Sequence, residues 1–306
     1  MSKEIKYYSN LRIFDKSGSK YIEKRYTLPT LNRQDLEDLM QRIVLQRSAF
    51  EDLHIPISRL ENIEIQKEDN LFQLVVIEKF EGLDFVDVVD ESNFEMYLER
   101  MLNDIYKPLL SSTNNEILPV GIDTAIRNCV FRIHEGDFCY VDFMPPKVNY
   151  RGHLTQEVPE IEGEFYNIRI LSHNNRFGVV YMLYINLARR YPSKRRVIAS
   201  LIEQFLNSID KRELFSFIEE SPFYRLKSNT DAIEIIKNIN DWKGLNYLYL
   251  REGACIAAQY NQTFAENIED FFKLTHHETD PDSIEYGLLP DARFKKAKSE
   301  LISVLK

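Results

Sequence analysis

The spacing of apolar residues changes near Gly82, and this change constrains the fold of the 306-residue chain more than any other feature. Before Gly82, apolar residues occur in short β-type runs that one stretch of helical spacing interrupts. After Gly82, helical spacing dominates. Side chains alternate along a strand but recur every three or four residues on one face of a helix. The sequence therefore predicts an α+β fold with two lobes, a small β-rich lobe over residues 1–82 and a larger, mainly helical lobe over residues 83–306.

The first lobe is expected to contain strands, then one helix, then two more strands. Ser17-Gly18-Ser19 separates two β-rich runs, which is the signal of a hairpin. Helical spacing extends from Asn32, the expected N-cap, to Leu53, and Pro56 ends the helix. The strands are expected over residues 3–9, 11–16, 20–27, 57–66 and 71–82.

In the second lobe, a helix is expected to begin at its N-cap Ser92 and to run towards Pro108. Two β-type runs then flank a polar turn at residues 134–137. We therefore expect a hairpin over residues 129–143, near the entrance of this lobe. Residues 147 to about 163 are polar and are expected to be irregular, and the rest of the chain is expected to be mainly helical.

The composition narrows the classes of partner. The chain is 44% hydrophobic and 28% charged, as in ordinary globular proteins, and has a formal net charge of −9. This charge argues against a general affinity for nucleic acid or for an anionic membrane, because both depend on clustered Lys and Arg. The longest apolar run, residues 177–188, is too short to span a bilayer and is typical of a buried core helix. The start of the sequence lacks the apolar stretch of a signal peptide, so a cytoplasmic location is expected.

Three polar residues around the predicted hairpin give the strongest chemical signal. Asn128 follows Asp123 by five positions, and Asp142 follows Asn128 by fourteen. The hairpin is expected to bring Asp142 back beside Asn128. Phosphoryl transfer from ATP in kinases uses one Asp as a base, an Asn five residues later as a metal ligand, and a second Asp across a hairpin as another metal ligand. Asn and Asp oxygens are also ligands that Mg²⁺ prefers. The alternative is that the three residues are ordinary turn residues.

The chain resembles the aminoglycoside phosphotransferase and choline kinase branch of the protein-kinase-like fold, over residues 1 to about 290. The segment "GIDTAIRN" stands where that family has a loop of the type HGDxxxxN, and "CYVDF" stands where it has a strand that ends in a metal-binding Asp. The resemblance implies that Asp123 is the catalytic base and that Asn128 and Asp142 are ligands of Mg²⁺.

Two departures from the family pattern stand at the ends of this segment. Gly121 occupies the place of the family's His, which removes a structural support of the loop. Phe143 is followed by Met144-Pro145-Pro146 instead of Gly, which predicts a stiffer segment than a kinase activation loop. An APE-type signature does not follow, so a platform for a peptide substrate is not expected.

The nucleotide side of the resemblance lies on the early strands. Ile22, Lys24 and Tyr26 share one face of a strand because side chains alternate. By resemblance, Lys24 points at the phosphates of ATP and Ile22 covers the adenine. Ser9 and Asn10 align with the SN of the family's GxSN phosphate loop, but the glycines that let the backbone approach phosphates are missing.

Two further elements of the nucleotide site are expected from the resemblance. A helix acid is expected to hold Lys24, and Glu37 is the candidate, with Gln41 one turn later on the same face as the open alternative. The stretch from Glu78 to Phe80 resembles the hinge that connects the lobes, where backbone groups would meet adenine.

The resemblance implies a phosphotransferase that uses ATP and Mg²⁺ and phosphorylates a hydroxyl group of a small molecule. The alternative is a pseudokinase, a nucleotide-binding or empty scaffold that acts through protein contacts, which the missing glycines and the departures at Gly121 and Pro145-Pro146 favour. Nucleotidyl transfer, or phosphorylation of a protein or a lipid-linked sugar, uses the same residues and stays open. In the helical lobe, Asp241 and Glu252 are interpreted as surface carboxylates rather than as contacts of a cationic acceptor.

Overall fold

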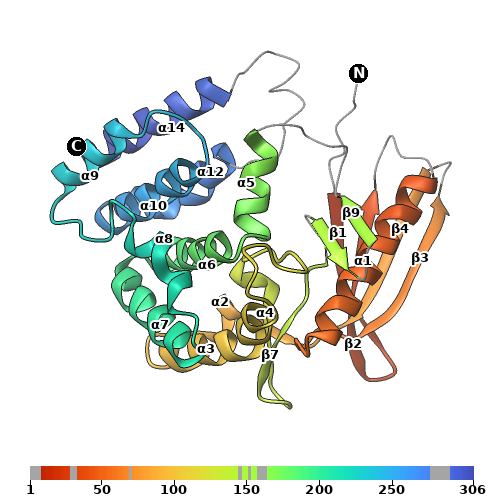
Figure 1. Cartoon of the computed structure of the whole chain (residues 1–306). Coiled ribbons are helices and arrows are strands. Elements are labelled where there is room, and N and C mark those ends of the chain that lie inside the picture. Colours follow the sequence, from red (N-terminus) through yellow and green to blue (C-terminus); the bar gives the residue numbers. More distant parts are fainter. Residues whose placement is uncertain are drawn as a thin grey trace. The chain divides into compact units, whose positions relative to one another are not determined.

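The computed structural model describes residues 8–27, 33–68, 71–143, 147–150, 153–156, 164–275 and 290–306. The chain forms two compact units, Met1–Glu160 and Ile161–Lys306. The first contains all the strands that the structure describes, and the second is built from helices (Figure 1). The predicted α+β class, with a small antiparallel sheet in the N-terminal region and a mainly helical C-terminal part, is confirmed at this level.

The main sheet of the first unit is antiparallel, with strand order β1-β2-β4-β3. Its strands are β1 (Tyr8–Lys16), β2 (Ser19–Thr27), β3 (Leu60–Glu68) and β4 (Leu71–Lys79). The predicted hairpin between β1 and β2 is confirmed, since Ser17 and Gly18 have φ values of 54° and 80°, the left-handed geometry of a tight two-residue turn. The expected strand over residues 3–9 falls mostly outside the described residues, and its last two residues begin β1.

One helix, α1 (Arg33–Asp52), follows β2 and packs against β3 and β4, as the apolar spacing predicted (Figure 1). Its buried face carries Leu36, Leu39, Ile43 and Phe50, each at most 2% exposed. The helix therefore covers the half of the sheet that β4 and β3 form.

A second, three-stranded sheet also belongs to the first unit. Its strands β5 (Gly82–Asp84), β6 (Cys129–Arg132) and β7 (Asp137–Tyr140) are antiparallel in the order β5-β6-β7, so the predicted hairpin is confirmed. The backbone of Tyr140 donates to Pro56 O at 2.9 Å and accepts from Ser58 N at 3.1 Å. These bonds join the hairpin to the chain that precedes β3. They agree with a first compact unit that continues beyond β5 to near residue 160. The division into two lobes at residue 82 stays a prediction.

The remaining elements of the first unit differ in detail from the prediction. The helix expected to begin at Ser92 has Asn93 as its N-cap and is divided into α3 (Phe94–Met101), a wider π-helical turn over Leu102–Tyr106, and α4 (Lys107–Ser111). Pro108, which lacks an N–H donor, lies in the first turn of α4, where no such donor is needed. A short helix α2 (Phe85–Val88) follows β5. The segment expected to be irregular contains a small hairpin, β8 (Lys147–Tyr150) and β9 (His153–Gln156).

The second unit is organised around α6 and α10, which pack against each other, while α10 also packs against α14 (Figure 1). The prediction of a buried core helix over residues 177–188 is confirmed, because α6 buries nearly every residue of that run. None of the helices in the described ranges is long and apolar enough to cross a lipid bilayer. The helices are α5 (Glu164–His173), α6 (Arg176–Arg190), α7 (Arg195–Ser208), α8 (Ser216–Glu219), α9 (Asn229–Asn238), α10 (Leu245–Tyr260), α11 (Gln262–Glu266), α12 (Ile268–Leu274) and α14 (Pro290–Leu305).

The close contact between α5 and α6 at Gly178 gives a test of this packing. A Cβ atom on Gly178 would lie 1.8 Å from the carbonyl oxygen of Leu171, so Gly178→Ala forces the two helices apart. We expect a loss of about 1–3 kcal/mol in the free energy of unfolding, as for other overpacked cores. The measurement is urea denaturation followed by circular dichroism.

Gly253→Ala in α10 is the matched control. The atoms nearest to its new Cβ, on Ile236 and Phe223, lie at 3.4 Å, which is ordinary contact. Because alanine favours the helix by about 0.5–1 kcal/mol over glycine, this variant is expected to be as stable as the unchanged protein or more so. Equal destabilisation by both substitutions would contradict the described packing of α5 on α6.

Candidate active site

A buried carboxylate, Glu78 on β4, lies at the centre of the candidate site in the first unit. Glu78 is only 2% exposed. Its Oε2 lies 2.9 Å from Nζ of Lys24 on β2, and its Oε1 lies 2.6 Å from an Nη of Arg47 on α1. The Ser58 hydroxyl donates to the same Oε1 at 3.0 Å. One carboxylate therefore holds two cations that come from the sheet and from the helix.

Lys24 also contacts the segment that leaves the hairpin. Its Nζ donates to Val141 O at 2.6 Å, and Val141 directly precedes Asp142. Tyr26, two residues along β2, is 5% exposed. Burial raises the pKa of Tyr26 well above its ordinary value, and the negative charges of Asp142 and Glu78 raise it further. The predicted phosphate lysine and the predicted metal ligand Asp142 therefore belong to one neighbourhood.

The hairpin brings Asn128 and Asp142 together, as its spacing predicted. Asn128 Nδ2 lies 3.4 Å from Asp142 Oδ2, and Val141 N donates to Asn128 O at 3.0 Å. Both side chains are half-buried. Their role as metal ligands stays a prediction.

Asp123 is held by the loop that it begins and by a buried tyrosine. Its Oδ1 accepts from Ala125 N at 2.9 Å, a bond that fixes the carboxylate within a local turn. Its backbone N–H and carbonyl both lie 3.3 Å from the hydroxyl of Tyr140, which is 1% exposed. Burial raises the pKa of Tyr140, and the charges of Asp142 and Asp123 act in the same direction. Asp123 and Asp142 thus both act electrostatically on one phenol.

Helix α1 supplies two supports that sequence reasoning missed. Gln46 Nε2 donates to Gly121 O at 3.1 Å. This bond anchors the loop at the position where the family that the chain resembles has a His. The Arg47 guanidinium stacks 4.4 Å from the ring centre of Phe143, directly after Asp142, while it binds Glu78. Burial lowers the pKa of Arg47 from its ordinary value, although the Glu78 charge opposes this. Met144-Pro145-Pro146 and their expected stiffness lie outside the described residues.

The structure corrects the expected partner of Lys24. Glu37 forms an ion pair at 2.8 Å with Arg33, one turn earlier on α1, and Gln41 is exposed. Lys24 pairs with Glu78 instead. The reason is geometric. The part of α1 that faces Glu78 carries the cation Arg47, so the acid that binds Lys24 comes from the sheet.

The hinge is expected at Glu78 to Phe80. Glu78 lies inside β4, in register with Ile22 on one side and with Leu60 on the other. The Phe80 N–H donates to Lys20 O at 2.9 Å and is thus already used within the protein. This N–H is one of the backbone groups of Glu78 to Phe80 that were expected to meet adenine, and the role of the stretch as a hinge stays a prediction.

The remaining predicted nucleotide contacts lie on regular strands. Ile22 is half-buried on β2, two residues before Lys24. Ser9 and Asn10 lie within β1, opposite Tyr26 and Arg25. They are strand residues, and the residues before Tyr8 lie outside the described range. The roles of Ile22, Ser9 and Asn10 towards ATP stay predictions.

The donors at Asn128 and Asp142 fit a magnesium ion of the type that keeps most of its shell for water and phosphate. Within the described ranges, His, Cys, Asp and Glu do not form any cluster of three or more, so a site made only of such side chains is not present there. An amide oxygen and a carboxylate are hard ligands that Mg²⁺ accepts in small number.

Comparisons with known proteins do not identify the chain. No protein-family model matches it, and no curated protein sequence matches it closely enough to count as a relative. The interpretation of the site therefore depends on its own geometry.

The Glu78 network predicts that loss of the Glu78 carboxylate destabilises the protein far more than loss of the Glu37 carboxylate. Glu78→Ala removes the carboxylate shared by Lys24 and Arg47 and leaves two cations without their partner. We expect a loss of about 3–5 kcal/mol in the free energy of unfolding, because an uncompensated charge stays in a buried place. Chemical denaturation measures this loss.

Glu37→Ala, which removes the acid of the more exposed pair with Arg33, is the control and is expected to cost less than about 1 kcal/mol. If the two substitutions have equally small effects, Glu78 does not hold the site together.

Proposed function

We propose that the chain is an ATP- and Mg²⁺-dependent phosphotransferase that acts on a hydroxyl group of a small molecule. The observation that carries this proposal is the bond from Lys24 to Val141 O, beside the contact between Asn128 and Asp142. Phosphoryl transfer needs a cation at the phosphates and metal ligands within reach of the same group, and these residues supply both. The order of strands and helix, with α1 after the lysine strand and a hairpin before Asp142, supports a kinase-like arrangement.

Each residue has a role that its contacts permit. The Lys24 ammonium has three N–H groups, of which Glu78 and Val141 engage two, and the third is left for a phosphate oxygen. Asp142 and Asn128 would hold Mg²⁺, which neutralises phosphate charge when bound. Asp123 uses Oδ1 for Ala125 and leaves Oδ2 for the acceptor hydroxyl.

In the proposed reaction, the hydroxyl oxygen of the acceptor attacks the γ-phosphorus of ATP. The bond from that phosphorus to the bridging oxygen breaks, ADP leaves, and the hydroxyl proton passes to Asp123. Because Asp123 is fixed at one oxygen by a backbone bond, its free oxygen has a defined direction. Such positioning supplies much of the rate in phosphoryl transfer.

The second candidate is a scaffold of the pseudokinase type. The arrangement that favours it is the engagement of Lys24 by both Glu78 and Val141, together with the Phe80 N–H bonded to Lys20 O. In this closed arrangement, protein groups bind the Lys24 ammonium. The Phe80 N–H, one of the backbone groups expected to contact adenine, is already hydrogen-bonded within the protein. A scaffold would retain this closed arrangement in the presence of nucleotide.

Thermal unfolding with nucleotide separates the two candidates. The proposed enzyme gains stability from millimolar Mg·ATP, because a ligand that binds only the folded state raises the melting temperature. Asp142→Asn should lose the magnesium-dependent part of this shift, whereas Asp87→Asn, on the short helix α2, should keep it. No shift in the unchanged protein would favour the scaffold.

The rate of ATP hydrolysis then tests Asp123 separately. In this slow reaction, water replaces the hydroxyl group of the acceptor. Asp123→Asn should still be stabilised by Mg·ATP but should hydrolyse it about 100-fold more slowly or worse, in the range expected for loss of a general base. Full turnover in this variant would contradict the assignment of Asp123.

A further inference from the structure

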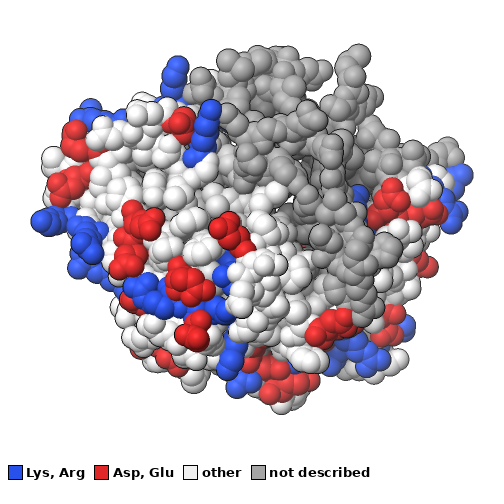
Figure 2. All heavy atoms as spheres, in the orientation of Figure 1, with Lys and Arg blue, Asp and Glu red and all other residues white. Residues whose placement is uncertain are grey.

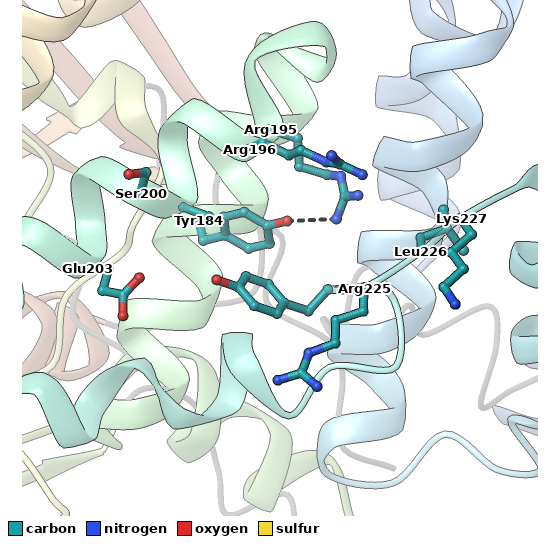
Figure 3. A pocket seen from close by; sticks show the side chains of 10 residues that line it. Tyr184, Arg195, Arg196, Ser200, Glu203, Arg225, Leu226 and Lys227 are labelled. Atoms are coloured by element: carbon teal, nitrogen blue, oxygen red, sulfur yellow. Dashed lines mark hydrogen bonds between the residues drawn. The ribbon is translucent and has the colours of Figure 1, made fainter.

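The second unit contains a pocket of about 430 Å³ with a basic lining. Helix α7 contributes Arg195 and Arg196, and the segment before α9 contributes Arg225 and Lys227 (Figure 3). Two tyrosines, Tyr184 from α6 and Tyr224, also line it. Pockets of this volume hold small organic molecules rather than single ions.

The positive charge of the pocket is not balanced by its own acids. Glu203, which also lines the pocket, is paired with Arg212 at 2.8 Å. Within the part of the chain that the structure describes, Arg196, Arg225 and Lys227 form no salt bridge. Three uncompensated cations therefore surround one pocket in a chain whose net charge is −9. On the face shown in Figure 2, acidic and basic side chains of the described residues are interspersed.

A buried network fixes the floor of the pocket. Glu252 on α10 is 1% exposed, so its interpretation as a surface carboxylate is wrong. Its Oε1 lies 3.0 Å from both the Tyr184 hydroxyl and an Nη of Arg195, and its other oxygen accepts from the hydroxyls of Tyr181 and Ser221. Arg195 also donates to the Tyr184 hydroxyl at 3.1 Å (Figure 3). Tyr184 and Arg195 are thereby held in place before any ligand arrives.

We propose that this pocket binds a small organic phosphate. Guanidinium groups bind phosphate oxygens through paired hydrogen bonds, and Lys227 adds a further positive charge. The tyrosines and the neighbouring Ala199 and Leu226 offer apolar surface for the organic part of the ligand. This inference does not depend on the proposed phosphotransferase activity, because all the residues involved belong to the second unit.

Titration calorimetry with pyrophosphate and with fructose 1,6-bisphosphate tests the proposal. EDTA is present throughout, so that magnesium-dependent binding in the first unit does not contribute. We expect binding that weakens as salt increases, since ions screen exposed charges. The triple variant Arg196→Gln, Arg225→Gln, Lys227→Gln should bind at least about tenfold more weakly, because it loses several charge-assisted hydrogen bonds. These three residues are exposed, so the variant should fold normally.

The matched control removes the same charge from exposed residues outside the pocket lining, through Arg190→Gln, Lys295→Gln and Lys296→Gln, and should bind as the unchanged protein does. Absence of binding to both phosphates would overturn the proposal. Equal losses in the two triple variants would overturn it as well, since the effect would then reflect net charge alone. Tighter binding of citrate than of either phosphate would replace phosphate by carboxylate as the ligand class.

Discussion

The shared carboxylate of Glu78 is the interaction on which the arrangement of the first unit depends. It joins Lys24 on β2, Arg47 on α1 and the Ser58 hydroxyl before β3, so the sheet, the helix and the chain between them meet at one point. Through these cations it also reaches the hairpin, because Lys24 binds Val141 O and Arg47 stacks on Phe143. Buried ion pairs contribute little net stability compared with apolar packing. We therefore interpret the network as a device that fixes Asp142 relative to Lys24.

Local spacing predicted much of the first unit, and long-range pairing explains what it missed. The hairpin and its return of Asp142 to Asn128 follow from short β-type runs around a turn, and they were correct. The predicted partner of Lys24 was wrong, because this pairing depends on which part of α1 faces the sheet. A signal was present, since Glu78 shares a strand face with the buried Leu74 and Val76. An acid at the end of such a face is expected to point into the core and to need a cation.

The second unit illustrates the same limit at larger scale. Arg195, Arg225 and Lys227 are unremarkable in the sequence, and their meeting around one pocket depends on how α7 and the segment before α9 fold together. Glu252 likewise looks like a single surface acid on a helix, but the packing of α10 against α6 buries it. Helical periodicity predicts which residues share a face, and it does not predict which faces of separate helices meet.

The most direct test of the central claim is to find which lysine lies beside the phosphates of bound ATP. An acyl phosphate derivative of ATP transfers its acyl group to a nearby lysine amine, and peptide mass spectrometry identifies the labelled residue. We expect labelling at Lys24 that requires the native fold and that excess Mg·ATP prevents. Labelling confined to other lysines, or labelling of Lys24 that Mg·ATP leaves unchanged, would contradict the placement of the nucleotide at Lys24 and Asp142.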